Sequence, residues 1–155
     1  MQHTSRLLAT FVIALSLAPQ MEFSLSAADW SIPVAGNAFR TSPTPGSQGF
    51  SRRGYLSWSE PEEVFSIYFH VDRPADLQLA MQARVPEGHS TLVAKVQQQS
   101  FSIAIDSPET TSYPVGRVGV SAAGYVRVDI QGAKRVGEVY AEISGLLVTS
   151  DTDDL

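Results

Sequence analysis

The sequence predicts an all-β protein: an antiparallel two-sheet β-sandwich of the jelly-roll type with about eight or nine strands. Polar and apolar residues alternate with period two over many short segments, which is typical of half-buried strands. Turns rich in Gly and Pro separate these segments, and no segment after residue 28 shows a helical period. A closed barrel fits the same pattern, but the first and last strands are long enough to lie side by side, which favours the sandwich.

The N-terminal segment indicates export. Arg6 precedes an apolar run over residues 7–18, which is too short to span a bilayer but suits the core of a signal peptide. Small residues follow at 26–28, so we expect cleavage near Ala28 and a secreted, periplasmic or cell-surface protein. An uncleaved membrane anchor is the alternative. The sequence thus predicts a signal peptide (residues 1–28), a β-sandwich domain (29–149) and an acidic C-terminal tail (150–155).

The expected strands follow from the alternation and the turn residues. Pro33 cannot donate a ladder hydrogen bond, so the first strand is predicted at a sheet edge. Residues 42–54 contain many turn formers and no periodicity, and are predicted to form a surface loop. In chain order, strands are expected at 30–34 with a continuation at 38–41, then at 55–58, 64–71, 77–85, 91–96, 100–105, 113–120, 125–131 and 138–148.

The strands at 64–71 and 77–85 are predicted to form an antiparallel hairpin, joined by the five residues from Asp72 to Asp76. Pairing Val71 with Leu77 brings every large apolar side chain to one face, and a one-residue slip would destroy this arrangement. In that register, Tyr68 lies opposite Ala80 and His70 lies opposite Gln78 on the water-facing side.

That water-facing side supplies the candidate ligand site. An uncovered aromatic ring surrounded by polar side chains suits a sugar, which stacks its C–H face and hydrogen-bonds through its hydroxyls. Alternatively, the 42–54 loop covers the Tyr68 ring, and the ring has a structural role instead of binding a ligand. The candidate ligand-binding residues are Tyr68, His70, Gln78, Gln82 and Arg84.

The other aromatic residues are expected to be structural. Trp58 shares the phase of Leu56 and is therefore predicted in the core. Tyr55 and Tyr113 are expected to be covered by neighbouring segments.

Composition excludes several classes of function. The chain has no cysteine, so disulfides, thiol catalysis and thiolate metal sites are excluded. A net charge of −5 without a basic cluster argues against binding to nucleic acid or to an anionic membrane surface. Arg52 and Arg53 form the one adjacent basic pair, which is expected in a solvated loop.

No catalytic constellation stands out. A nucleophile needs an adjacent, oriented base, and only His70 and His89 follow the signal segment. The carboxylates Glu60, Glu62 and Glu63 fit a solvated turn better than a paired glycosidase site. Asp129 lies mid-strand on the face of Tyr125 and Arg127, where an ion pair or solvent exposure is expected rather than catalysis.

No cofactor is predicted, although a calcium ion is possible, because oxygen ligands are in supply at turns and in the tail. No binding-loop motif specifies its ligands, so the metal site stays unknown, and two histidines alone argue against zinc. The candidate calcium ligands are Asp72, Asp76, Asp106, Asp151, Asp153 and Asp154.

Five segments read together resemble a known family: IPVAGNAF (32–39), YLSWSEP (55–61), IYFHVDRPADLQL (67–79), GYVRVDIQG (124–132) and GEVYAEISGLLV (137–148). In this order and spacing they resemble the secreted bacterial domain of unknown function 5077, which commonly precedes a larger uncharacterised domain. The resemblance implies a β-sandwich like carbohydrate-binding modules and galactose-binding-like domains, and it brings no established binding residues.

The sequence therefore predicts a non-catalytic, exported β-sandwich that binds carbohydrate or a cell-surface glycan. The alternative is a structural or protein-interaction module that docks onto a partner protein, such as the companion domain that the chain lacks.

Overall fold

The computed structural model describes residues 28–46, 49 and 54–150, and all of their regular structure is β-strand. No helix that could cross a membrane occurs within these ranges. The signal segment, the residues after Ser150 and the Arg52–Arg53 pair lie outside the described residues, so those predictions stay predictions. The strands are β1 (Ala28–Pro33), β2 (Ala38–Ser42), β3 (Leu56–Ser57), β4 (Val64–Val71), β5 (Ala75–Arg84), β6 (His89–Val96), β7 (Gln99–Ile105), β8 (Thr111–Val120), β9 (Gly124–Val136) and β10 (Glu142–Ser150).

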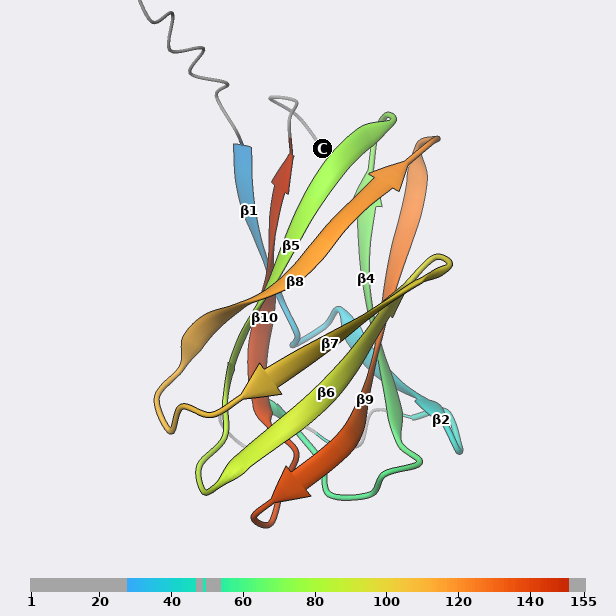
Figure 1. Cartoon of the computed structure of the whole chain (residues 1–155). Coiled ribbons are helices and arrows are strands. Elements are labelled where there is room, and N and C mark those ends of the chain that lie inside the picture. Colours follow the sequence, from blue (N-terminus) through green and yellow to red (C-terminus); the bar gives the residue numbers. More distant parts are fainter. Residues whose placement is uncertain (1–27, 47–48, 50–53, 151–155) are drawn as a thin grey trace, which may run out of the picture.

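The strands form two antiparallel five-stranded sheets that pack face to face (Figure 1). Sheet I has the order β1-β10-β5-β8. The short strand β3 pairs with the first two residues of β10, and β1 pairs with the later part of β10 on the same side. Sheet II has the order β2-β4-β9-β6-β7. The predicted two-sheet sandwich is confirmed, and so are the pairing of the first strand with the last and the edge position of Pro33.

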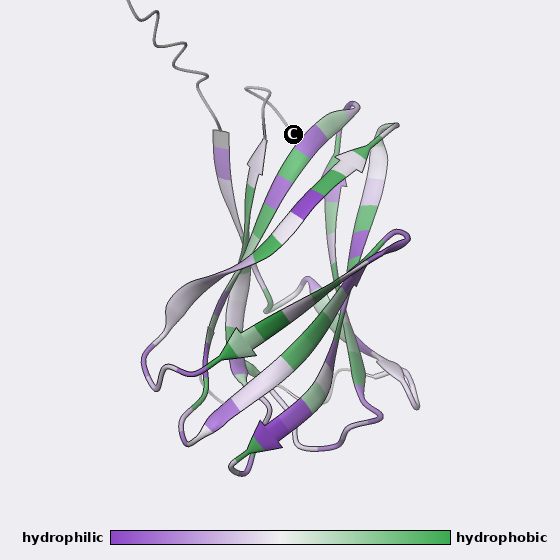
Figure 2. Cartoon of the chain, in the orientation of Figure 1, coloured by the Kyte–Doolittle hydropathy of each residue, from purple (hydrophilic) through white to green (hydrophobic). Residues whose placement is uncertain are grey.

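Alternation along each strand builds the core between the sheets. In Figure 2, hydrophobic and hydrophilic bands alternate along strands of both sheets. Inward side chains of β4 such as Phe65 and Ile67 are fully buried, as are Leu79 and Met81 of β5. Trp58 is 3% exposed and contacts the rings of Phe65 and Tyr140, which confirms its prediction as a core residue.

The predicted hairpin between β4 and β5 is wrong. β4 pairs with β2 and β9 in sheet II, whereas β5 pairs with β10 and β8 in sheet I. Both strands direct their apolar faces into the core, but they do so from opposite sides. The three residues 72–74 between them carry the chain from one sheet to the other, and three extended residues span about the 10 Å that separates packed sheets.

Two further boundaries differ from the prediction. Residues 132–136, expected in a connection, belong to β9, which pairs with β6 up to the pair His89–Val136. The last strand begins at Glu142 and not at residue 138. The register of β9 against β6 shifts between Thr91 and Leu92, and this irregularity breaks the alternation that would have marked the longer strand.

Candidate functional site

The failed hairpin separates the five residues of the predicted ligand patch. Tyr68 and His70 lie on the outer face of sheet II, whereas Gln78, Gln82 and Arg84 lie on the outer face of sheet I. These two faces point in opposite directions, so the five side chains do not form one site. The binding role of each single residue stays a prediction.

Arg84 already has structural partners on sheet I. Its Nε donates to Oε2 of Glu142 at 2.7 Å, and the two residues are cross-strand partners on β5 and β10. Its guanidinium also lies 5.4 Å from the centre of the Tyr55 ring. The side chain therefore fastens β5 to β10 and the segment before β3, which agrees with the structural role expected for Tyr55.

Tyr113 also has the structural role that was expected. Its ring is buried, and its hydroxyl accepts hydrogen bonds from the backbone N–H groups of Asp106 and Ser107 at 3.3 and 3.0 Å. The ring thus anchors the turn between β7 and β8.

The outer face of sheet II carries a different group of aromatic side chains, here called the aromatic cluster. Strand pairing brings His70 opposite Tyr125, with ring centres 5.1 Å apart in an edge-to-face arrangement. Tyr68 contacts Phe39 of β2, with ring centres 6.3 Å apart. Tyr125 is 78% exposed and Phe39 is 47% exposed, which is unusual for rings of this size on a sheet. The aromatic cluster consists of Phe39, Tyr68, His70 and Tyr125.

Tyr68 is partly covered in the structure. It is half-buried, and its described ring neighbour is Phe39 rather than the loop that follows β2. Much of that loop lies outside the described residues, so its coverage of Tyr68 stays an open prediction.

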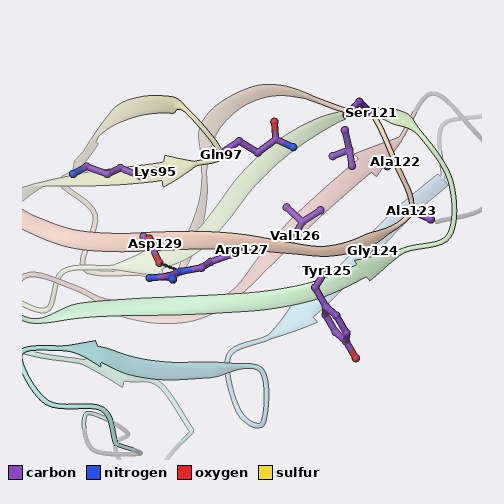
Figure 3. Close-up of a pocket in the computed structure, with 11 residues that line it drawn as sticks. Lys95, Gln97, Ser121, Ala122, Ala123, Gly124, Tyr125, Val126, Arg127 and Asp129 are labelled. Atoms are coloured by element: carbon purple, nitrogen blue, oxygen red, sulfur yellow. Dashed lines mark hydrogen bonds and ion pairs between the residues drawn. The ribbon is translucent and has the colours of Figure 1, made fainter.

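Beside the aromatic cluster lie two open hollows, of about 550 and 230 Å³, here together called the groove. Both hollows are lined by the same three charged residues: Lys95, Arg127 and Asp129. The larger hollow also takes in Tyr125, the β6–β7 turn residue Gln97, the 121–123 connection and Gly124 (Figure 3). The smaller one extends toward β2, at Thr41 and Ser42.

The end of β6 explains why the larger hollow exists. β9 pairs with β4 from Gly124 onward, but its pairing with β6 begins only at Val128. The chain turns back into β7 after Val96, so among the described strands β9 has no neighbour on that side over residues 124–127. A strand that continues past its neighbour leaves an opening at the sheet surface.

A hydrogen-bond network fixes the charged side chains of the groove. Arg127 Nε donates to Asp129 Oδ1 at 2.6 Å, as the dashed line in Figure 3 shows. The hydroxyl of Ser66 also donates to Asp129 Oδ1. Because that donation uses the one hydroxyl proton of Ser66, Thr41 must be the donor in its 2.8 Å hydrogen bond with Ser66.

Asp129 also affects the charge of its neighbour. Its hydrogen bond and negative charge raise the pKa of the Arg127 guanidinium above its ordinary value. Arg127 therefore stays positively charged at any pH at which the protein is folded. One alternative predicted for Asp129 was an ion pair with neighbours of Arg127, whereas in the structure the ion pair forms with Arg127 itself.

Sequence reasoning noticed that Tyr125, Arg127 and Asp129 share a face, but it did not connect them with Tyr68 and His70. Lys95 was missed altogether. The missing information was the pairing of β4 with β9 and of β9 with β6, which join strands far apart in the sequence.

The described part of the chain contains no group of three or more His, Asp or Glu side chains arranged to hold a metal ion. Asp106 accepts a hydrogen bond from the Tyr113 hydroxyl at 3.3 Å, and Asp72 contacts His70 at 3.0 Å. Asp151, Asp153 and Asp154 lie outside the described residues, so calcium binding stays a prediction.

Comparison with known proteins identifies the family. The profile described as a domain of unknown function (DUF5077) matches residues 32–153. The chain belongs to the DUF5077 family. No curated protein matches this DUF5077 chain.

Solved structures confirm the fold class. The DUF5077 chain is similar to a CBM35 module of Abf62 from Cellvibrio japonicus, with a TM-score of 0.58, 9% identity, and coverage of 78% of this chain and 92% of the module. It is also similar to a Xyl-CBM35 solved in complex with a glucuronic acid-containing disaccharide, with a TM-score of 0.56, 9% identity, and coverage of 76% and 91%.

A third similar structure is a GH26-CBM35 β-(1,4)-mannanase from Podospora anserina, with a TM-score of 0.60 and 14% identity. The match covers 79% of this chain but only 27% of the mannanase chain. At these identities the similarity establishes the β-sandwich fold and does not by itself transfer a ligand.

Proposed function

We propose that this DUF5077 chain is a non-catalytic carbohydrate-binding module, and that the saccharide lies on the outer face of sheet II, across the aromatic cluster and the groove. One observation carries the proposal: the highly exposed residue Tyr125 lies at an open hollow that also presents polar and charged side chains, among them Gln97 and Arg127. A sugar ring presents an apolar C–H face and a rim of hydroxyls, and this surface offers a partner for each.

The polar partners are held in place before a ligand arrives. Ser66 and Arg127 both donate to Asp129, so the carboxylate cannot rotate without losing hydrogen bonds. Side chains ordered in advance lose less conformational entropy on binding, which improves affinity for hydroxyl groups. His70 contacts the Tyr125 ring edge-on and limits the positions that the stacking ring can adopt.

The fold supports the same function. The CBM35 structures named above share this sandwich, and one of them was solved with a bound disaccharide. A module is also a better description than an enzyme, because the chemistry of nucleophilic catalysis needs a base in contact with a nucleophile. Among the described residues, the polar partner of His70 is the carboxylate of Asp72, not a hydroxyl. The signal segment makes export of this module part of the proposal.

Isothermal titration calorimetry with a panel of plant, algal and bacterial oligosaccharides tests the proposal. We expect binding by the wild-type protein, and an affinity about two- to tenfold lower for Tyr125→Ala because a stacking ring is lost. Gln78→Ala is the matched control, since Gln78 is exposed on the opposite face of the sandwich. Absence of binding to every saccharide at millimolar concentration would overturn the proposal.

A further inference from the structure

We propose that the saccharide taken by the groove is anionic, a sugar bearing a carboxylate or a sulfate group, and that Lys95 together with Arg127 holds its negative charge. This inference rests on the proposed function and names the class of ligand. It comes from the charges of the groove residues and from the partners that they already have.

Lys95 is the residue that defines this preference. It projects from the outer face of β6, is exposed and lines both hollows of the groove. Among the described residues, no hydrogen bond or ion pair engages its ammonium group. A cation without a partner in a groove is available to a ligand.

The carboxylate directly opposite Lys95 is already paired with Arg127. Asp129 is the cross-strand partner of Lys95, but its Oδ1 atom receives hydrogen bonds from Ser66 and Arg127. The negative charge of Asp129 is therefore balanced by Arg127. The positive charge of Lys95 is thus not balanced by Asp129.

Arg127 can still contribute to an anion site. Only its Nε is committed to Asp129 in the described network, and the side chain is 51% exposed. A guanidinium has further N–H donors in a planar fork that matches the oxygens of a carboxylate or a sulfate. Arg127 is the diagonal cross-strand neighbour of Lys95, a relation that places the two residues about 7–8 Å apart, close enough for both long side chains to reach one anionic group.

The local charge contrasts with that of the whole chain. The charged residues lining the groove are Lys95, Arg127 and Asp129, which carry one net positive charge, whereas the whole chain carries −5. The overall charge repels anionic ligands, and the groove is a local exception that gives such a ligand a defined place to bind.

Paired probes that differ only in the anionic group test the inference by calorimetry. One pair is trigalacturonic acid and its methyl ester, and the other is a sulfated galactan oligosaccharide and its desulfated form. We expect the anionic member of a pair to bind about two- to fivefold more tightly at low ionic strength, the gain typical of exposed ion pairs. Raising the salt concentration should weaken the binding of this member alone, because salt screens exposed charges.

Two substitutions locate the effect. Lys95→Gln should remove the preference for the anionic member, and Lys95→Arg should restore it. Lys134→Gln is the matched control: it removes the same charge from an exposed position of β9 that does not line the groove, so it should leave the preference unchanged.

The outcomes separate this inference from the proposed function. Equal binding of both members of each pair, or a preference that survives Lys95→Gln, would overturn the anionic assignment and leave carbohydrate binding in place. Failure of all four probes to bind would overturn the anionic assignment, and the neutral members of the wider panel would then decide the proposed function. The two pairs also show whether a carboxylate or a sulfate is the group that Lys95 takes.

Discussion

Ser66 is a fully buried hydroxyl on the outer face of sheet II, although its neighbours on that face are at least partly exposed. Thr41 of β2 lies against it on one side and Asp129 of β9 on the other. The hydroxyl therefore links three strands through side chains alone. It also fixes the carboxylate to which Arg127 is bound.

Ser66→Ala should lower the free energy of unfolding by about 1–2 kcal/mol, because it removes a hydrogen bond to a charged group and the hydrogen bond from Thr41, whose hydroxyl keeps only the longer one to the Val64 carbonyl. Urea unfolding measures the change. The same substitution should weaken saccharide binding, since Asp129 and Arg127 lose their fixed positions. Ser102→Ala, at an exposed position on β7, should change neither quantity, and an equal effect of both substitutions would contradict the role given to Ser66.

Gly132 shows how closely the core is packed. A Cβ atom at this position would lie 2.4 Å from atoms of the Tyr140 ring. That ring has little room to move, because Trp58 stacks against it with ring centres 5.9 Å apart. Gly132 is therefore required by space rather than by backbone conformation.

Gly132→Ala should destabilise the protein by about 1–3 kcal/mol through overpacking. Gly119→Ala makes the same chemical change in β8, where the nearest atom is a carboxylate oxygen of the exposed Asp76 at 3.1 Å. We expect the control to stay within about 0.5 kcal/mol of the wild-type protein. Thermal and urea unfolding of both variants provide the comparison. An equal loss of unfolding free energy in Gly119→Ala and Gly132→Ala would contradict the packing argument.

β4 and β5 mark the boundary of what the sequence could predict. Alternation identified both strands and their buried faces, because period-two hydrophobicity depends on each strand alone. It could not identify their partners, since a strand with one apolar face satisfies that face equally well beside its neighbour or across the core. The short connection after Val71 is compatible with a hairpin and with a crossing between sheets. Only the long-range pairing of β4 with β9 decides between them.

An engineered disulfide tests this pairing in a protein that contains no cysteine. His70→Cys combined with Tyr125→Cys should form an intramolecular disulfide on mild oxidation, because these cross-strand partners place their Cα atoms within disulfide range. His70→Cys combined with Gln78→Cys, which face each other in the predicted hairpin, should remain reduced. Mass spectrometry after alkylation distinguishes the oxidised from the reduced protein. The opposite result would support pairing of β4 with β5 and contradict its pairing with β9.

The candidate site was predictable only in part, for the same reason. The outward position of Tyr68 and His70 follows from alternation, and both belong to the aromatic cluster. Gln78, Gln82 and Arg84 were added because they lie outward on β5, and the crossing between sheets moved them to the opposite face. Lys95 gives no local signal, since a lysine on an exposed strand face is ordinary until its neighbours are known.

The two outer faces of the molecule differ in the side chains that they present to solvent. Sheet I carries the Arg84–Glu142 ion pair with Tyr55 against it, and its first edge is lined by β1 and β3. Sheet II carries the exposed aromatic cluster and the groove. A module built in this way has one face suited to a saccharide, and the opposite face serves as an internal control for every binding experiment.

Ligand binding to the native state should stabilise the whole domain. A saccharide present at one hundred times its dissociation constant should raise the free energy of unfolding by about 2.7 kcal/mol. Urea unfolding with and without the ligand measures this gain. At the same ligand concentration Tyr125→Ala should gain less, and an equal gain in both proteins would show that binding does not involve the Tyr125 ring.

The most direct test of the account is a two-dimensional amide NMR titration of the ¹⁵N-labelled protein with a saccharide that binds by calorimetry. We predict that the largest chemical-shift changes fall on the outer face of sheet II, at Tyr68, His70, Lys95 and residues 124–129. Residues 78–84 of sheet I should stay close to their free positions. Changes concentrated on residues 78–84, or at neither face, would contradict the central claim that sheet II carries the carbohydrate site.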